Sequence, residues 1–442
     1  MAVYGWWRAS VAAVFGLSAV LVACAPEAAA PEDARPDAID AAPRLSLAHL
    51  DKLQPALQAE VDAGLRPGFV ALVLQGDAVV HQTGAGFADI ETQSPIGPNT
   101  RFRLASMSKP IISVAALKLV EEGRLLLSDP VSRFLPEFKD KRVVTSMDAG
   151  PDGQFPAQPT DAPITIHNLL THMAGLGYPF DPSTDLGKMF QANNLYHGQG
   201  PLAERIAQLA DMPLYEEPGT LYRYSYATDV LGRVLEVVTG QSLEAYLKAA
   251  IFDPLGMNDT AFFVDETDLD GAATVYYTGP DGALAPSPGL FLGLEPNVQG
   301  FGWMSGGGGL ISSAADYARF VLMLMNAGTY QGARILSPAS VRMLRTKSVP
   351  DAAEPAAWAA IGRDFGLGVS IAQEPGLAGR TAALGEYGWP GYYGTFFAIS
   401  PADDLAYIVM TQYEPGTNYR PSRANALVGS IVYGSLEYAG AR

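Results

Sequence analysis

Strand signals lie near both ends of this 442-residue chain, and helix signals fill the part between them. Residues 69–86 read as a hairpin, since two apolar runs flank a Gly-Asp turn. Residues 394–412 read as a second hairpin that turns at 401–404, and residues 365–372 have the pattern of one strand. We therefore predict one antiparallel sheet built from both ends of the chain. A mostly helical insertion would lie beside it, with an active site in the cleft between the two.

Helical periodicity marks the middle of the chain. In residues 228–239 the apolar side chains recur on one face, and Gly240 is expected to end the helix. Residues 139–163, with several Gly, Pro and Asp, predict a long loop of the kind that often borders an active site. The folded part is expected to start near Leu45, where leucines recur at helical spacing. Helices are predicted over residues 107–122, 166–173, 202–210, 228–239 and 242–251, with a last one over 422–438.

The first 24 residues have the layout of a secretory signal, with one Arg, an apolar run and the sequence Leu-Val-Ala-Cys at the end. The cleavage region resembles a bacterial lipobox, in which Cys24 becomes the lipidated first residue; the alternative is an ordinary signal peptide with an incidental Cys. We expect a lipoprotein signal peptide over 1–24, an Ala-, Pro- and acid-rich linker over 25–45, and the folded domain over 46–442. The protein would be exported to the cell envelope and face the periplasm, held to the membrane only by a lipid on Cys24.

Composition and missing motifs narrow the possible functions. The net charge is −17, from 29 basic and 46 acidic residues, and phosphate binding needs a basic face, so nucleic acid is not an expected partner. Cys24 is the single cysteine, so a domain with a lipidated Cys24 offers no thiol for catalysis or metal binding. The five histidines form no H-E-x-x-H pair, and His167 and His172 are read as structural. No metal and no cofactor is expected.

The sequence does not support two other enzyme classes, the α/β-hydrolases and the phosphate-loop proteins. No G-x-S-x-G nucleophile elbow is present, so an α/β-hydrolase route to an esterase lacks its nucleophile turn. The glycine run over residues 306–309 has no Lys-Ser or Lys-Thr behind it, which makes a phosphate loop improbable. Close packing of the backbone at the cleft is the better interpretation of these glycines.

A lysine stands where a helix least tolerates a cation. In "SMSKPIISVAALKLVEEG" (residues 106–123) Ser106 is expected to be the N-cap, so Lys109 falls in the first turn, where the helix dipole disfavours a positive charge by roughly 0.3–1 kcal/mol. Side chains at i and i+3 share a face, and both burial and the dipole favour a neutral amine that can take the serine proton. The alternative is a solvated lysine beside a capping serine. The buried stripe of this helix would be Ile111, Ile112, Ala115, Leu119 and Val120.

This stretch resembles the Ser-x-x-Lys motif of the serine β-lactamase and penicillin-binding protein superfamily, in particular its class C and family VIII carboxylesterase branch. Four further stretches are similar to family segments in order and spacing, and the resemblance covers nearly everything from about residue 47 to 438. These stretches hold a helix after the first long loop, the second motif, a glycine-rich approach to a late helix, and the third motif: residues 164–176, 217–247, 305–320 and 388–401.

The resemblance implies an α+β fold of the β-lactamase/transpeptidase type, with an antiparallel sheet flanked by helices in three layers (αβα) and an inserted, mostly helical domain. It implies that Ser106 is the nucleophile, that Lys109 is its general base, and that Tyr224 is the hydroxyl that exchanges protons with Lys109. The oxyanion hole would consist of the backbone N–H groups of Ser106 and Tyr392.

Two motifs depart from those of the lactamases. The second is Tyr-Ser-Tyr (residues 224–226) in place of Y-x-N, and the third is Trp389-Pro390-Gly391 in place of K-T-G. The lost Lys and Thr normally help to hold a substrate carboxylate, so Trp389 and Gly391 would border an uncharged acyl or alcohol group. The expected function is hydrolysis of small carboxylic esters through an acyl-enzyme on Ser106. The alternatives are amide chemistry on peptides or β-lactams, as a D,D-carboxypeptidase, penicillin-binding protein or weak β-lactamase, and a non-catalytic envelope binding module.

Overall fold

The computed structural model describes residues 43–197, 200–262, 271–289 and 303–438. The predicted signal peptide over 1–24, its Cys24 and most of the predicted linker over 25–45 lie outside these described residues. Within the described residues, no helix combines the length and the apolar character that a membrane crossing requires.

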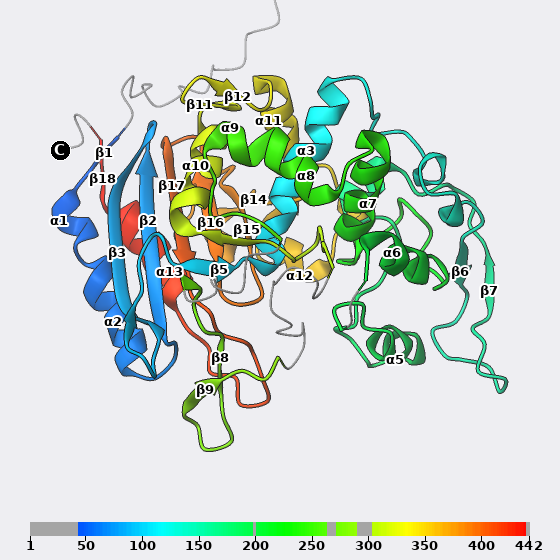
Figure 1. The fold of residues 1–442 in the computed structure, drawn as a ribbon, viewed down its shortest axis with the longest axis horizontal. Coiled ribbons are helices and arrows are strands. Elements are labelled where there is room, and N and C mark those ends of the chain that lie inside the picture. The colour runs from blue at the N-terminus through cyan, green and yellow to red at the C-terminus, as the bar shows by residue number, and fades with distance from the viewer. Residues whose placement is uncertain (1–42, 198–199, 263–270, 290–302, 439–442) are drawn as a thin grey trace, which may run out of the picture. The chain divides into compact units, whose positions relative to one another are not determined.

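An eight-stranded antiparallel sheet combines segments from both ends of the chain (Figure 1). In spatial order its strands are β13 (Arg363–Phe365), β14 (Ser370–Ala372), β15 (Tyr387–Pro390), β16 (Phe396–Ser400), β17 (Leu405–Met410), β2 (Gly68–Gln75), β3 (Ala78–Asp89) and β4 (Ser94–Pro95). The N-terminal hairpin β2–β3 joins the C-terminal hairpin β16–β17 through β2 and β17, where Leu72 lies opposite Ile408. The predicted sheet and both predicted hairpins are therefore confirmed.

Residues 365–372, predicted as one strand, belong to two. A tight turn joins β13 to β14, and it closes with a hydrogen bond from Gly366 N–H to Val369 O (2.8 Å). Within the turn Gly368 has φ 87°, a left-handed conformation that only glycine adopts without steric cost. The prediction was wrong because the two glycines read equally well as small residues inside a strand.

Helices cover both faces of the sheet. In β2, alternate residues from 69 to 73 pack with the helices of one face, and alternate residues from 70 to 74 pack with those of the other. Successive strand residues point to opposite faces, so a strand buried on both sides reads as an unbroken apolar run. The expected three-layer α+β fold is confirmed. The helices are α1 (Leu47–Leu50), α2 (Leu53–Asp62) and α13 (Ala424–Gly434) on the first face, and α3 (Ser108–Glu121) and α10 (Ala314–Met325) on the second.

The predicted helical insertion is also present, between α3 and α10 in the chain. Its helices α5, α6 and α7 and the small hairpin β6–β7 occupy the right-hand side of Figure 1. That hairpin lies within residues 139–163, which were predicted to be a long loop. The elements are α4 (Ile166–Leu170), α5 (Asp185–Ala192), α6 (Leu202–Ala210), α7 (Ala227–Thr239), α8 (Leu243–Leu247), α9 (Asp253–Leu255), β6 (Arg142–Val144) and β7 (Ala157–Pro159).

Two predicted helices end earlier than expected, and a third changes its type before its predicted end. The helix predicted over 166–173 stops with α4, and the one over 242–251 changes after α8 into a π-helical turn over Lys248–Phe252. The helix predicted over 422–438 ends at Gly434 because β18 (Leu436–Glu437) pairs with β1 (Arg44–Leu45). The remaining elements are β5 (Arg101–Arg103), β8 (Tyr276–Thr278), β9 (Leu284–Pro286), β10 (Ile311–Ser313), β11 (Thr329–Tyr330), β12 (Ala333–Arg334), α11 (Pro338–Leu344) and α12 (Ala356–Ala359).

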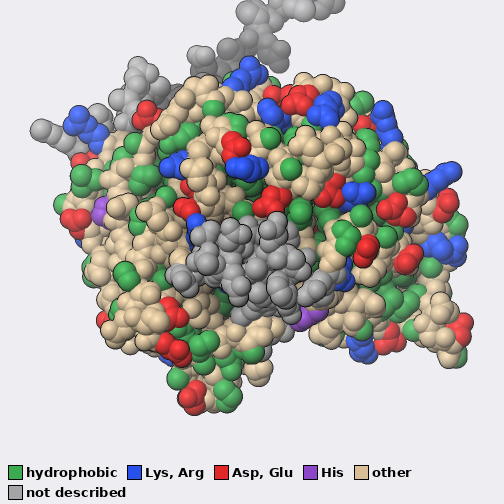
Figure 2. All heavy atoms as spheres, in the orientation of Figure 1, with side chains coloured by type: hydrophobic (Ala, Val, Ile, Leu, Met, Phe, Trp, Pro, Cys, Tyr) green, Lys and Arg blue, Asp and Glu red, His purple; other side chains and the backbone are tan. Residues whose placement is uncertain are grey.

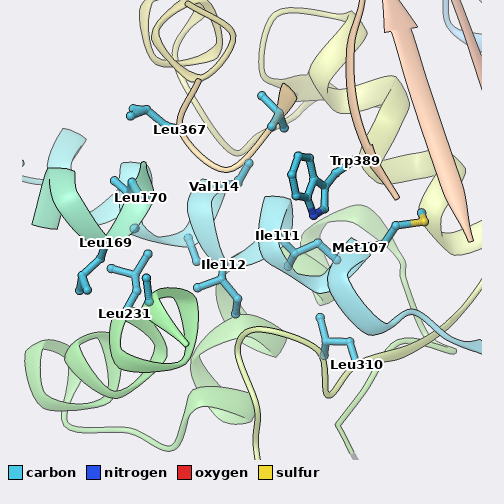
Figure 3. Close-up of a cluster of buried hydrophobic side chains, with 14 of the residues drawn as sticks. Met107, Ile111, Ile112, Val114, Leu169, Leu170, Leu231, Leu310, Leu367 and Trp389 are labelled. Carbon is cyan, nitrogen blue, oxygen red and sulfur yellow. The ribbon is translucent and has the colours of Figure 1, made fainter. Parts of the chain in front are cut away.

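The helix α3 runs through the centre of the main core. Of its 14 residues 11 are buried, so it does not have the single buried stripe that the sequence predicted, and Val120 from that stripe is only half-buried. Figure 3 shows Ile111 and Ile112 pointing away from the helix, with Trp389 on one side of it and Leu231 on the other. A helix that is apolar all round lies inside a protein. The first turn of α3 therefore carries its polar side chains into the interior.

The surface in Figure 2 shows how the charges are distributed on one face of the molecule. Acidic and basic side chains are interspersed there, and the acidic side chains do not form one continuous patch. Among the described residues on this face there is therefore no broad basic area for a polyanion.

Candidate active site

Ser106 lies in a 3₁₀ turn over Ala105–Met107, immediately before α3. It is therefore not the N-cap that the sequence predicted, since Met107 occupies that position and no side chain caps the helix. The extra turn moves the first α-helical residue to Ser108. The Ser106 hydroxyl is left for another partner, and it accepts a hydrogen bond from Lys109 Nζ at 3.1 Å.

The residue before this serine has a strained backbone. Ala105 has φ 45°, in the left-handed region, where a non-glycine residue costs of order 1–3 kcal/mol. Two hydrogen bonds hold the adjacent Leu104: its N–H donates to Leu310 O (2.9 Å), and its carbonyl accepts from Thr395 Oγ1 (3.0 Å). Segments next to β10 and β16 thus fix the turn that presents Ser106.

Lys109 lies inside the protein, with 1% of its surface exposed. Its Nζ donates to Ser106 Oγ and, at 2.6 Å, to Gly307 O. The same nitrogen lies 4.6 Å from the centre of the Tyr224 ring and 5.5 Å from the centre of the Tyr178 ring. The alternative of a solvated first-turn lysine is therefore wrong. A buried amine, a partly exposed hydroxyl and a partly exposed phenol thus lie together where the sheet meets the helical insertion.

Tyr224 lies just before α7, with its ring against the third motif. The Trp389 indole N–H donates to Tyr224 Oη at 3.4 Å, and the two ring centres are 5.6 Å apart. Trp389 is itself only 6% exposed, and its ring also packs on Trp358 and Phe365. The indole is therefore a buried wall behind Tyr224 as well as a donor to its hydroxyl, a contact that the sequence pattern did not indicate.

His172 packs against the other side of Tyr224, with ring centres 4.7 Å apart. Its Nδ1 accepts a hydrogen bond from Ser225 N–H at 3.3 Å. Burial and the positive charge of Lys109 hold the pKa of His172 well below its usual value of 6.5, so the ring is neutral at pH 7. A neutral ring bound to the backbone agrees with the structural interpretation, but its position against Tyr224 was not predicted.

The glycine run over residues 306–309 brings backbone close to α7. A Cβ on Gly306 would lie 2.7 Å from Thr228 O, and one on Gly307 would lie 2.5 Å from Asp229 Oδ2. Neither position has room for a side chain, which confirms the interpretation of close backbone packing. Gly307 O is the second acceptor of Lys109 Nζ, so this close packing also fixes the position of an oxygen that binds the amine.

The third motif brings its backbone next to the serine turn. A Cβ on Gly391 would lie 2.2 Å from Leu104 O, so only glycine fits there. Tyr392 follows directly, and its ring packs against a small apolar cluster that includes Ala105. The structure thus places Ser106 and Tyr392, the two residues predicted to form the oxyanion hole, on adjoining segments.

Sequence reasoning missed three neighbours of the reactive groups. Tyr178 lies with its ring centre 5.2 Å from that of Tyr224, His172 packs as described, and Asp229 is fully buried beside Gly307. Of these, Asp229 had a usable signal, because an acid stands among the apolar positions of the α7 stripe. The two aromatic residues gave none, since most buried aromatic side chains serve packing alone.

The arrangement suits nucleophilic acyl transfer. A serine hydroxyl lies beside a buried amine, and a phenol lies next to that amine, which are the groups that such a reaction needs for attack and for proton transfer. Among the residues that the structure describes, no group of three or more His, Cys, Asp or Glu side chains is arranged to hold a metal ion.

Comparisons with known proteins agree with this description. The Beta-lactamase family model matches residues 53–429. "Protein Rv1367c" of Mycobacterium tuberculosis is 36% identical over 375 residues, which cover 83% of this chain and 91% of that protein. "Esterase EstB" of Burkholderia gladioli is 32% identical over 379 residues, covering 81% and 90%. Among solved structures, "EstCE1, a hydrolase with promiscuous acyltransferase activity" has a TM-score of 0.73 at 29% identity, covering 88% of this chain and all of the other.

Proposed function

Because this chain belongs to the beta-lactamase family, we propose that it is a serine hydrolase that cleaves carboxylic esters of small substrates through an acyl-enzyme on Ser106. The observation that carries the proposal is the 3.1 Å contact between Nζ of the buried Lys109 and Oγ of the half-buried Ser106. A buried amine in contact with a serine hydroxyl has the geometry of a base and its nucleophile.

The reaction would begin with neutral Lys109, which takes the proton of Ser106 as Oγ bonds to the ester carbonyl carbon. The carbonyl oxygen becomes an oxyanion, and the N–H groups of Ser106 and Tyr392 would donate to it. The proton then passes by way of Tyr224 to the alkoxide, which leaves as the alcohol. Water attacks the acyl-enzyme with the same groups as base and acid, and the carboxylic acid and free Ser106 result.

Tyr224 has two neighbours that support a proton-transfer role. The amine of Lys109 lies over its ring, and the Trp389 indole N–H donates to its oxygen. Both interactions favour a phenol oxygen that gains negative charge, because a cation and a hydrogen-bond donor stabilise an anion. The third motif thus supplies a neutral donor at the place where the lactamases have a lysine.

The expected substrate class follows from the replacement of the K-T-G motif by Trp389-Pro390-Gly391. In place of the cation of K-T-G, the chain has a tryptophan whose ring belongs to a buried aromatic group with Trp358 and Phe365. An apolar wall does not repay the desolvation of a substrate carboxylate. We therefore expect neutral esters to be better substrates than β-lactams or peptides that carry a free carboxylate, which agrees with the description of the Burkholderia relative as an esterase.

A paired assay tests the proposed substrate class. The purified protein is given p-nitrophenyl acetate, p-nitrophenyl butyrate and a chromogenic cephalosporin, and kcat/KM is compared among them. We expect both esters to be turned over at least about tenfold more efficiently, which corresponds to about 1.4 kcal/mol of transition-state preference. Predominant cephalosporin turnover would instead favour the lactamase or D,D-peptidase alternative. No turnover of any of the three would favour the binding module.

We further propose that the protein is lipid-anchored in the cell envelope and faces the periplasm. The support is the apolar run that ends in Leu-Val-Ala-Cys24, followed by a polar tether. A Cys24→Ser variant should move from the membrane fraction to the soluble fraction after cell lysis, because no acyl chain can then be attached. The control is the wild-type protein, which detergent and not high salt should release. An unchanged membrane fraction for Cys24→Ser would contradict the anchor.

A further inference from the structure

Asp229 is a fully buried carboxylate in the first turn of α7. It lies in the apolar core, where Val230 and Leu231 follow it directly. An ionised carboxylate in such a place costs several kcal/mol unless other groups compensate its charge. A neutral asparagine could accept the same hydrogen bonds without that cost, so the charge itself calls for an explanation.

The bonds of Asp229 lead to the reactive amine. Its Oδ1 accepts from Ser305 Oγ (2.5 Å) and from Gly307 N–H (2.9 Å). The carbonyl of the same Gly307 accepts from Lys109 Nζ (2.6 Å), and Nζ contacts Ser106 Oγ. One glycine residue therefore connects the carboxylate to the amine, and the glycine cannot move toward Asp229 because the two already touch.

The second carboxylate oxygen is also informative. Asp229 Oδ2 is buried and has no hydrogen-bond partner among the residues that the structure describes. A carboxylate that served packing alone would be expected to satisfy both oxygens. An unpaired oxygen leaves negative charge free to act across a medium of low dielectric constant.

We propose that Asp229 is a positioning residue for the ester hydrolysis described above: through Gly307 it holds an acceptor on Lys109, and its negative charge sets the pH range in which the Ser106–Lys109 pair reacts. The inference rests on the proposed function, because it assigns a device to the same Ser106–Lys109 pair.

Lys109 is the basic side chain that faces Asp229 among the described residues. Burial raises the pKa of Asp229 above its usual value, and the Lys109 charge together with Ser305 opposes that shift. Burial also raises the pKa of Tyr178 and of Tyr196 well above 10, and the pKa of Tyr226 is raised in the same way. The groups that face the pair from the surrounding elements are Tyr178, His172, Tyr196, Tyr224, Tyr226 and Ser305.

The sign of the effect follows from electrostatics. A carboxylate near an amine favours the ammonium form, so the negative charge of Asp229 opposes formation of a neutral base. Asp229→Asn removes the charge and keeps an oxygen for Ser305 and Gly307. The ascending limb of the kcat/KM profile should then move to lower pH by about one unit, the lower end for a nearby opposite charge.

The experiment measures kcat/KM for p-nitrophenyl butyrate against pH in the full-length wild type, Asp229→Asn, Ser305→Ala and Asp316→Asn. Ser305→Ala removes one donor to the carboxylate, which weakens its ionised form and should shift the limb in the same direction by less. This milder variant carries the test if Asp229→Asn does not fold. Asp316 is the matched control, since it is also buried in a first helical turn but pairs with Arg319 in α10.

A shift of the ascending limb in Asp229→Asn supports the proposal, provided that the limb stays in place in Asp316→Asn. If Asp229→Asn does not fold, the same shift in Ser305→Ala supports it. A limb that stays in place in both site variants overturns it, even if the maximal rate falls, because a purely structural role lowers the rate without moving the limb. Such a result leaves the proposed function intact, which fails only if the wild type shows no ester hydrolysis that depends on Ser106.

Discussion

Replacement of Ser106 with alanine is expected to lower kcat/KM for p-nitrophenyl butyrate by at least about 10³-fold, since the loss of a covalent nucleophile removes the acyl-enzyme route altogether. The change deletes one oxygen from a 3₁₀ turn whose backbone is held by other bonds, so folding should be preserved. A fluorophosphonate probe, which phosphonylates activated serines, should label the wild type in proportion to its activity and should not label Ser106→Ala.

Ser108 provides the matched control for this prediction. It lies two residues further along, is fully buried, and uses its Oγ to accept a hydrogen bond from Leu310 N–H at 3.2 Å. Ser108→Ala should lower the free energy of unfolding by about 1–3 kcal/mol, because a buried donor loses its acceptor, while probe labelling persists. Undiminished hydrolysis by Ser106→Ala, or labelling that disappears with Ser108 instead, would contradict the assigned nucleophile.

Replacement of Lys109 with methionine is expected to slow acylation by at least about 10²-fold, the lower end for a lost acid–base partner. Methionine keeps the unbranched apolar stem in the core and removes only the amine that contacts Ser106 and Gly307. The rate of the pre-steady-state p-nitrophenol burst, with substrate in excess, measures acylation directly. Arginine is no substitute at this position, because its guanidinium does not give up its proton in proteins.

The control for the second prediction lies on the same helix. Lys118 is partly exposed and lies 3.9 Å from Glu122, so Lys118→Met should change the unfolding free energy by at most about 1 kcal/mol and leave the burst unchanged. If Lys109→Met acylates within a few-fold of the wild type, Lys109 is not the base, and the contact with Ser106 has a structural purpose only.

Local sequence signals predicted the main elements of the fold. The hairpin β2–β3 has two apolar runs around Gly76-Asp77, and β16–β17 turns at residues 401–404, so each carries its own turn chemistry. The end of α7 at Gly240 was equally local, because the left-handed conformation there suits glycine. These features need no knowledge of distant parts of the chain.

The errors in the fold have tertiary causes. The helix predicted over 422–438 is cut short because Leu436 pairs with Leu45, at the other end of the folded domain. The N-cap assigned to Ser106 was wrong because the hydrogen bonds of Leu104 to Leu310 and Thr395 hold the serine in a 3₁₀ turn ahead of α3. In α3 a single buried stripe was expected, but the sheet and the insertion together cover the helix on all sides. The periodicity of apolar residues does not reveal how many elements pack around a helix.

The candidate site also has a part that local sequence signals predicted and a part that depends on tertiary contacts. Ser106 and Lys109 could be found because residues three positions apart in a helical turn lie on the same face. The contact of Trp389 with Tyr224 and the path from Asp229 through Gly307 join segments that lie far apart in the chain. No spacing rule predicts such contacts. What the sequence did show was an acid inside an apolar stripe, an inconsistency of the kind that functional positions often display.

The pairing of Leu72 with Ile408 has a consequence for the life of the chain before it is complete. A chain synthesised only as far as residue 224 contains Ser106, Lys109 and Tyr224, but it lacks Trp389, and Leu104 lacks the hydrogen bond from Thr395. The candidate site is therefore complete only after the last strands of the sheet have been made.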